Sequence, residues 1–186
     1  MTLSLKHIGL LAGIVLIFVS FLFFGRQHGT YQVLSIGGLA IAFGFYIAIL
    51  FGKGHLKTKI FWTVFIVIGV IVQYLTEPFL RDISYRIFIS QNKNTLTEIN
   101  NILLKKQDDI TILNGNISEG NQLSISEGQR LREASKELGA YIISKSDNRI
   151  YYGLWGFLDV RLGITYSQNK SKPGSNYWHL TGSWFR

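Results

Sequence analysis

The chain has 186 residues, no cysteine and a net charge of +8. Without cysteine it has no disulfide, no thiolate metal site and no thiol redox chemistry. Polarity changes sharply near Pro78, since 14 of the 19 basic and 10 of the 11 acidic residues lie beyond Glu77. This division predicts two units, a transmembrane domain over residues 1–78 and a soluble, modestly basic domain over residues 79–186.

Three uncharged apolar runs occupy the first unit, at residues 8–24, 31–51 and 60–75. Each is close to the roughly 20 residues that a helix needs to cross the hydrocarbon core of a bilayer. A cleaved signal peptide is disfavoured for the first run, because bulky Phe21–Phe24 stand where small residues are required. No run contains an ionisable residue, which disfavours a pump or transporter. We therefore predict a three-helix transmembrane bundle in a multi-pass protein of the cell inner membrane.

Small residues recur along the first two runs at the spacing of one helix face. Gly9 and Gly13 form one pair, and Ala40, Gly44 and Ala48 form a longer stripe. Such stripes let helix backbones approach closely in lipid. They are compatible both with packing inside one subunit and with assembly of several subunits.

Basic residues do not fix the orientation of the chain, because the positive-inside rule gives equal counts for the two sides. One side has Lys6, Lys53, Lys57 and Lys59, and the other has Arg26, Arg81, Arg86 and Lys93. Another criterion is needed to decide which side faces the cytoplasm.

The chain beyond the last run predicts a small α+β domain with a mainly antiparallel sheet and two helices. Residues 83–89 alternate apolar and polar side chains like a strand, with continuation of the third helix as the alternative. Thr95 and Glu98 have the spacing of a capping box that begins a first helix. Residues 109–113 predict a short strand that ends at Asn114-Gly115, and the polar stretch to Gln122 predicts a loop.

The second helix has the clearest boundaries. Ser124 and Glu127 form a capping box at its start, and Gly139 follows as a C-cap glycine. Acidic residues at helical spacing from Arg130 indicate surface ion pairs on this helix. Four strands are expected after it, at residues 140–143, 149–155, 158–166 and 177–185.

Catalytic chemistry has no support in the sequence. The histidines lie in four separate segments without metal-ligand spacing, at His7, His28, His55 and His179. No glycine-rich phosphate loop, nucleophile elbow or catalytic triad is present. We expect neither an enzyme nor a metal or cofactor site, so a membrane-bound nuclease or hydrolase ranks last among the hypotheses.

The C-terminal half interleaves cations with aromatic residues. Basic side chains neutralise phosphates and aromatic rings stack on bases, at about 1–3 kcal/mol per base. The mixture suits a small nucleotide or a single strand and not a nucleic-acid duplex, although core aromatics and a solvated lysine loop are the simpler interpretation. The expected ligand-binding residues are Arg149, Tyr151, Arg161, Lys170, Lys172 and Trp178.

The order of these parts, an apolar bundle from Ile8 to Leu75 and then one small basic α+β domain ending at Arg186, resembles the membrane effectors of type III CRISPR antiviral defence. The resemblance implies a cytoplasmic C-terminal domain that binds a cyclic oligoadenylate, with cyclic tetra-adenylate as the expected ligand. It also implies a homo-oligomer, a tetramer matching the ligand's symmetry, whose transmembrane part perturbs the membrane. The alternative is a toxin-immunity or envelope accessory protein whose extracytoplasmic domain binds another protein.

Overall fold

The computed structural model describes residues 4–24, 28–119, 123–157 and 160–186 of the chain. It divides into two compact units, Met1–Ser84 and Tyr85–Arg186. The border lies inside one long helix, α3 (Leu56–Gln91). The border predicted from the sequence, between residues 1–78 and 79–186, stays a prediction.

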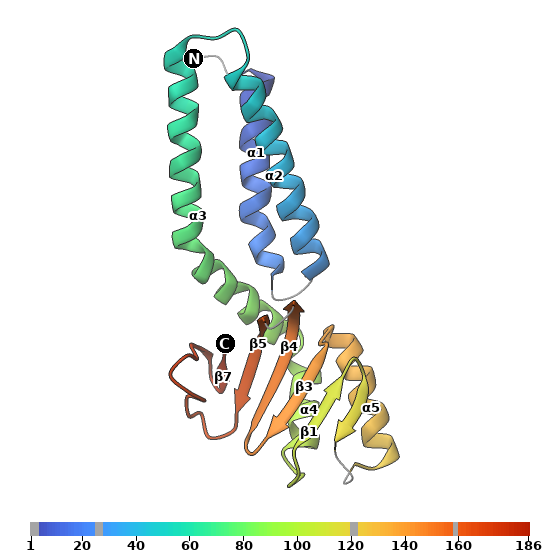
Figure 1. Ribbon diagram of the computed structural model, residues 1–186. Coiled ribbons are helices and arrows are strands. Elements are labelled where there is room, and N and C mark those ends of the chain that lie inside the picture. Colours follow the sequence, from blue (N-terminus) through green and yellow to red (C-terminus); the bar gives the residue numbers. More distant parts are fainter. Residues whose placement is uncertain (1–3, 25–27, 120–122, 158–159) are drawn as a thin grey trace. The chain divides into compact units, whose positions relative to one another are not determined.

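The first unit consists of three long apolar helices (Figure 1). These are α1 (Leu5–Ser20), which ends in a 3₁₀ turn η1 (Phe21–Phe23), then α2 (His28–Leu50) and α3. All three are long and apolar enough to cross a membrane, which confirms the expected transmembrane bundle.

Helices α1 and α2 pack through glycine. A Cβ added to Gly13 would lie 2.5 Å from the backbone nitrogen of Ala42, and one added to Gly9 would meet the ring of Phe45. A Cβ on Gly44 would meet nothing within 4 Å. The Gly9/Gly13 pair therefore serves packing within the subunit, whereas Gly44 lies on an open face of α2.

Helix α3 is attached to the other two near both ends of the bundle. Trp62 is buried with Leu10 of α1 and Ile49 of α2. Its ring stacks on the ring of His7, with centroids 4.7 Å apart. Towards the other end, the Ser84 hydroxyl donates to the carbonyl oxygen of Leu22 at 3.1 Å.

The expected strand at residues 83–89 is wrong, because α3 continues as a helix to Gln91. The alternating pattern ignored Phe88, which is also apolar. Tyr85, Phe88 and Ile89 are all buried, and their spacing is that of one helix face. The 3.6-residue period thus prevails over the two-residue period in this segment.

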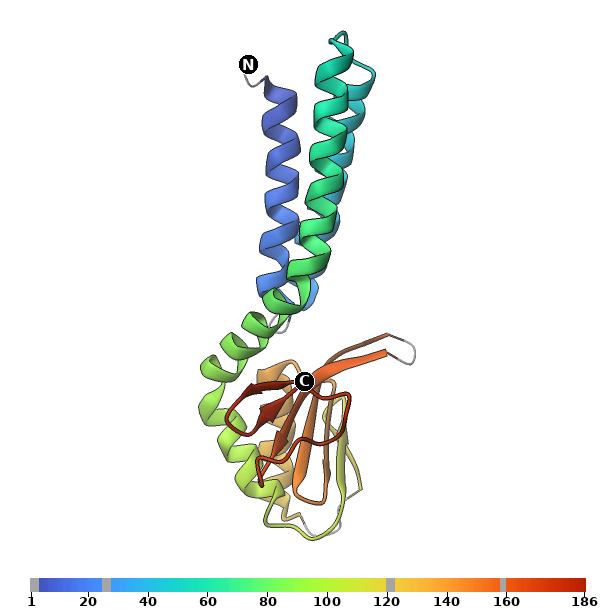
Figure 2. The same ribbon diagram turned by 90° about the vertical axis from the view of Figure 1, so that its left-hand side faces the viewer.

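The second unit is an antiparallel seven-stranded sheet with the strand order β2-β1-β3-β4-β5-β7-β6. Helices α4 (Lys93–Leu103) and α5 (Ile125–Leu138) cover one of its faces (Figure 2). This confirms the predicted α+β domain. The strands are β1 (Ile110–Leu113), β2 (Asn116–Glu119), β3 (Ile142–Ser146), β4 (Arg149–Phe157), β5 (Val160–Ser167), β6 (His179–Thr181) and β7 (Trp184–Phe185).

The core lies between the sheet and the two helices. Ile112, Ile143, Tyr152 and Ile164 are register partners across four adjacent strands and are completely buried. The Tyr152 hydroxyl donates to Asn100 on α4 at 2.7 Å, which fixes this face as the helix-facing one. Alternate residues of the strands lie on the other face, opposite the two helices.

Several predicted elements need correction. Asn114 and Gly115 have φ angles of 50° and 78°, the pair of positive values of a type I′ hairpin turn. The stretch read as a loop therefore contains β2. The last expected strand, 177–185, is two short strands that reverse at Gly182, where φ is 55°. The expected strand 140–143 begins at Ile142, and the first two residues of the expected strand 158–166 lie outside the described part of the chain.

The two capping boxes have different outcomes. The box at Thr95 and Glu98 is wrong, because α4 begins earlier, at Lys93, and Glu98 instead accepts from Arg130 of α5. The box at Ser124 and Glu127 is confirmed, as is Gly139, which has φ 63° at the end of α5.

Candidate ligand-binding site

Three of the predicted ligand-binding cations lie near one corner of the soluble domain. Arg149 is exposed at the start of β4, and its Nη1 donates to the carbonyl oxygen of Pro173 at 3.0 Å. Lys170 and Lys172 are exposed in the same loop, which follows β5. We call Arg149, Lys170 and Lys172 the basic corner.

Of the two predicted aromatic residues, Tyr151 belongs to β4 and Trp178 lies just before β6. Tyr151 pairs with Thr165, and Thr165 pairs with Phe185, so these three side chains share the face of the sheet opposite α4 and α5, where Thr165 and Phe185 are buried. His179 is the register partner of Phe185 and contacts its ring. Trp178 is 66% exposed. The stacking role expected of Tyr151 or Trp178 stays a prediction.

Arg161 belongs to β5, but its side chain lies outside the part of the chain that the structure describes. Its predicted role in ligand binding stays a prediction.

A hollow that the sequence analysis did not anticipate lies on the helix-covered side of the sheet. Its volume is about 340 Å³. One wall comes from the end of α3 and from α4, and the other comes from β5 and the β6–β7 hairpin. We call it the α4–β7 pocket. The side chains that matter most for its chemistry are Lys93, Thr97, Asn100, Asn101, Tyr166 and Trp184.

A hydrogen bond fixes the inner part of this pocket. The buried Tyr152 hydroxyl donates to Oδ1 of Asn100, which leaves the amide nitrogen of Asn100 as a donor for other groups. Burial, and then the proximity of Tyr166, raise the pKa of Tyr152 well above its usual value. Tyr152 therefore stays protonated at neutral pH and keeps its donor role.

Aromatic rings form the sheet side of the pocket. The rings of Tyr166 and Trp184 meet edge to face with centroids 5.1 Å apart, and Trp184 also contacts Tyr152 at 5.7 Å. These contacts hold the Trp184 ring in place, since a ring bounded by two others loses rotamer freedom. The pocket thus combines a lysine, amide groups and an ordered pair of rings.

Most of the charge on α5 is already used within the domain. Arg130 makes two hydrogen bonds with Glu98, at 2.7 and 2.8 Å, and one with Glu137 at 3.1 Å. The hydrogen bonds from Arg130 lower the pKa of Glu98. Lys106 contacts Glu127 at 2.8 Å, and this bond, with those from Ser124, lowers the pKa of Glu127 to about 2. The predicted ion pairs around Arg130 are confirmed.

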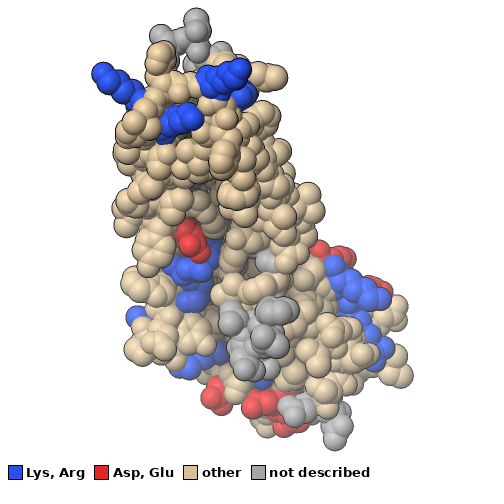
Figure 3. Space-filling model, turned by 45° about the horizontal axis from the view of Figure 1, so that its top comes forward, with Lys and Arg blue, Asp and Glu red and all other residues tan. Residues whose placement is uncertain are grey.

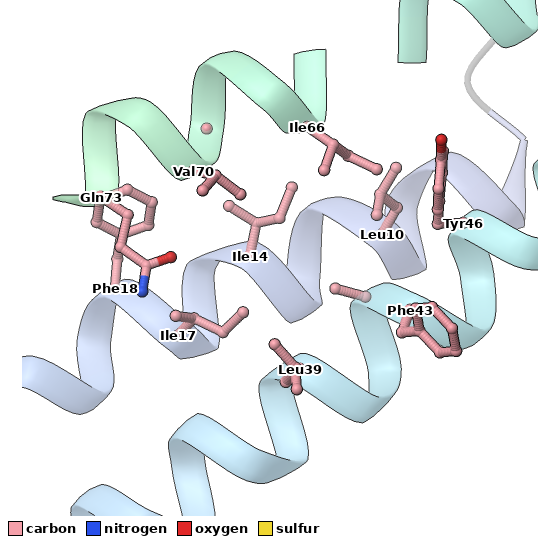
Figure 4. Close-up of a pocket in the computed structure, with 12 residues that line it drawn as sticks. Leu10, Ile14, Ile17, Phe18, Leu39, Phe43, Tyr46, Ile66, Val70 and Gln73 are labelled. Atoms are coloured by element: carbon pink, nitrogen blue, oxygen red, sulfur yellow. The ribbon is translucent and has the colours of Figure 1, made fainter. Parts of the chain in front are cut away.

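A second hollow lies within the membrane unit, between α3 and the pair α1 and α2 (Figure 4). Its volume is about 230 Å³, and aliphatic and aromatic side chains form nearly all of its lining. Gln73 of α3 contributes its one amide, beside Phe18 of α1. This lining suits hydrocarbon and not an anionic ligand.

Sequence reasoning missed the α4–β7 pocket because its walls are far apart in the chain. One indication was available: Leu96, Ile99 and Leu103 form the apolar stripe of α4, and Asn100 stands within that stripe. A polar residue on a buried helix face requires a hydrogen-bond partner and often belongs to a site.

Among the residues that the structure describes, no three His, Asp or Glu side chains lie close enough to hold a metal ion. Comparison with known proteins gives no matching protein family and no significant similarity to a curated protein or to a solved structure.

Proposed function

We propose that the protein is a membrane-anchored receptor and defence effector whose soluble domain binds a nucleotide. The expected ligand is a cyclic oligoadenylate, of which one nucleotide unit occupies the α4–β7 pocket. The observation that carries this proposal is the presence of Lys93, Asn100 and the Tyr166–Trp184 ring pair in one hollow of about 340 Å³. Ligand pockets in proteins start at about 300 Å³, and this size suits a single nucleotide unit.

Each part of the pocket has a role in this proposal. The Lys93 ammonium group neutralises a phosphate. The amides of Asn100 and Asn101 donate to and accept from the edge of the base, which distinguishes adenine from other bases. The Trp184 ring supplies a stacking surface of the kind that contributes about 1–3 kcal/mol per base.

The basic corner has a different role in the proposal. Arg149, Lys170 and Lys172 do not line the α4–β7 pocket, so they attract the anionic ring or contact phosphates outside the pocket. A cyclic ligand with several equal nucleotide units then calls for several copies of the pocket, which is why we propose a homo-oligomer, a tetramer for cyclic tetra-adenylate.

The membrane unit acts as the output in this proposal. The soluble domain faces the cytoplasm, the three helices cross the inner membrane, and ligand binding favours one of two packing arrangements of the assembled helices. A ligand shifts such an equilibrium only by its differential affinity for the two states. Perturbation of the membrane follows from the favoured arrangement.

The test is ligand binding by the full-length protein in detergent, with cyclic tri-, tetra- and hexa-adenylate as ligands and AMP as a reference. Trp184→Leu should weaken binding at least about fivefold, because it removes a stacking contact of roughly 1–3 kcal/mol. Lys93→Gln should also weaken binding, because it removes the charge that neutralises a phosphate. Lys105→Gln is the matched control, since Lys105 is exposed beyond the end of α4 and outside the pocket lining. Absence of affinity for every cyclic ligand, or equal losses in the control, contradicts the proposal.

One observation favours the alternative of an extracytoplasmic protein-binding domain. Trp178 is 66% exposed and Ile125 is 93% exposed, and large exposed apolar side chains are typical of protein-binding surfaces. Reporter enzymes active only inside or only outside the cytoplasm, fused to Arg186, distinguish the two hypotheses. A cytoplasmic C-terminus supports the nucleotide receptor, and an external one supports the protein-binding domain.

A further inference from the structure

A second concentration of charge lies in the membrane unit, at the end where α1 begins. Figure 3 shows basic side chains gathered there. The start of α1, the end of α2 and the start of α3 enclose a cleft of about 290 Å³. We call it the basic cleft; its polar lining comes from Ser4, Lys6, His7, Lys53, Thr58 and Lys59.

Within the described part of the chain, the lysines of the basic cleft have no acidic side chain nearby, and only the carbonyl end of α2 offsets part of their charge. The chain has no Asp or Glu before Glu77, which belongs to a later turn of α3 than the cleft residues. The first turns of α1 and α3 contain no acidic residue, so the positive ends of both helix dipoles add to the charge of the lysines. An anion from outside the chain is needed to balance this end of the bundle.

Packing orders part of the cleft. The Lys6 ammonium group donates to the carbonyl oxygen of Ala48, at the end of α2, at 3.2 Å. It passes over Gly52, where an added Cβ would lie 3.1 Å from Lys6 Nζ and 2.7 Å from the Ala48 oxygen. Gly52 is therefore required for this position of Lys6.

His7 adds an imidazole ring to the cleft. Its ring stacks on the buried Trp62 with an angle of 9° between the planes, and its Nδ1 accepts from the backbone N–H of Ser4 at 3.2 Å. In the neutral ring, the proton then belongs to Nε2, which can donate to an oxygen.

We propose that the basic cleft binds the phosphate of an anionic phospholipid headgroup. The cleft lies at the end of apolar membrane-spanning helices, which is the depth of the headgroups. The neighbouring side chains of Leu5, Phe51 and Leu56 are 72–86% exposed in the isolated chain and suit the acyl chains attached to such a headgroup. Basic residues near a bilayer surface attract anionic lipid in this way.

The binding constants of the full-length protein for individual lipids test this proposal, measured by native mass spectrometry in detergent. We compare phosphatidylglycerol with phosphatidylcholine, which has the same phosphate but no net charge. The protein should bind phosphatidylglycerol at least about fivefold more tightly. The Lys6→Gln/Lys59→Gln variant should lose about thirtyfold in affinity for phosphatidylglycerol, since each basic residue near an anionic surface contributes about 1 kcal/mol.

Lys57→Gln is the matched control, because Lys57 is exposed in the same segment and does not line the cleft. An equal loss in this control would show that general surface charge is responsible and would overturn the proposal. Equal binding of the two lipids by the wild-type protein, which needs no variant, would also overturn it. Displacement of phosphatidylglycerol by millimolar inorganic phosphate would assign the cleft to free phosphate and not to lipid.

Discussion

Replacement of Tyr152 by Phe tests the buried hydrogen bond that supports the α4–β7 pocket. The substitution keeps the buried ring and removes the hydroxyl that donates to Asn100 Oδ1 at 2.7 Å. Tyr152 is completely buried and Asn100 is 6% exposed, so water does not readily replace the lost donor. An unsatisfied buried acceptor costs about 1–3 kcal/mol. The melting temperature of the soluble unit should therefore fall by several degrees.

The assay is thermal unfolding of the full-length protein in detergent, followed by tryptophan fluorescence, because Trp184 contacts the Tyr152 ring. A double-mutant cycle with Asn100→Leu isolates the bond, since removing both polar partners should be less destabilising than the sum of the two single changes. A loss below about 0.5 kcal/mol for Tyr152→Phe, or strict additivity in the cycle, would refute the argument.

Three further predictions concern the cap of α5, its acid sensitivity and the helix bundle. Ser124→Ala should cost about 1 kcal/mol, because it removes the N-cap acceptor; an unchanged melting temperature would contradict this. The hydrogen bond from Lys106 is the main cause that lowers the pKa of Glu127 to about 2. Glu127 therefore stabilises the fold above about pH 4.5, and this contribution is lost as the pH falls towards 2. Glu127→Gln should flatten that acid limb in a pH series of melting curves. Gly13→Leu should destabilise the α1–α2 pair, whereas Gly44→Leu should leave it intact, as measured by thermal stability in detergent.

Alkaline unfolding provides an independent test of Tyr152. Burial raises its pKa well above the usual value, so the unfolded chain releases this proton at a lower pH than the folded one. The associated stability is complete below about pH 10 and is lost as the pH rises further. Tyr152→Phe should reduce this loss, and an identical alkaline limb in the variant would contradict the assignment.

Local patterns were sufficient for some elements. Ser124 and Glu127 mark the start of helix α5, and Gly139 marks its end. The three membrane-spanning helices are predicted by the length and composition of their apolar runs alone. In each case neighbouring residues carry the information, and no distant contact is needed to interpret it.

Elements that depend on distant partners were harder to predict. Strand β2 has a single large apolar residue, Ile117, and it forms by pairing with β1 across the Asn114-Gly115 turn. The end of α3 has both a two-residue and a 3.6-residue pattern, and only burial of Phe88 decides between them. The nature of these elements was therefore settled by packing and not by local preference.

The candidate site shows the same limit. The hydrogen bond from Arg149 to the carbonyl oxygen of Pro173 brings Arg149 to the loop that contains Lys172, and no local pattern in the sequence indicates this contact. The α4–β7 pocket needs two walls from opposite ends of the soluble domain's sequence, so only Asn100 in the stripe of α4 gave an indication of it.

Photo-crosslinking of the full-length protein with an azido derivative of cyclic tetra-adenylate tests the central claim most directly. The modified peptide is identified by mass spectrometry, with unlabelled ligand as the competitor. Our account predicts competed labelling within α4 at residues 93–101 or within the hairpin at residues 179–185. Labelling confined to the loop of Lys170 and Lys172 would transfer the site to the basic corner, and no competed labelling would contradict nucleotide binding by this domain.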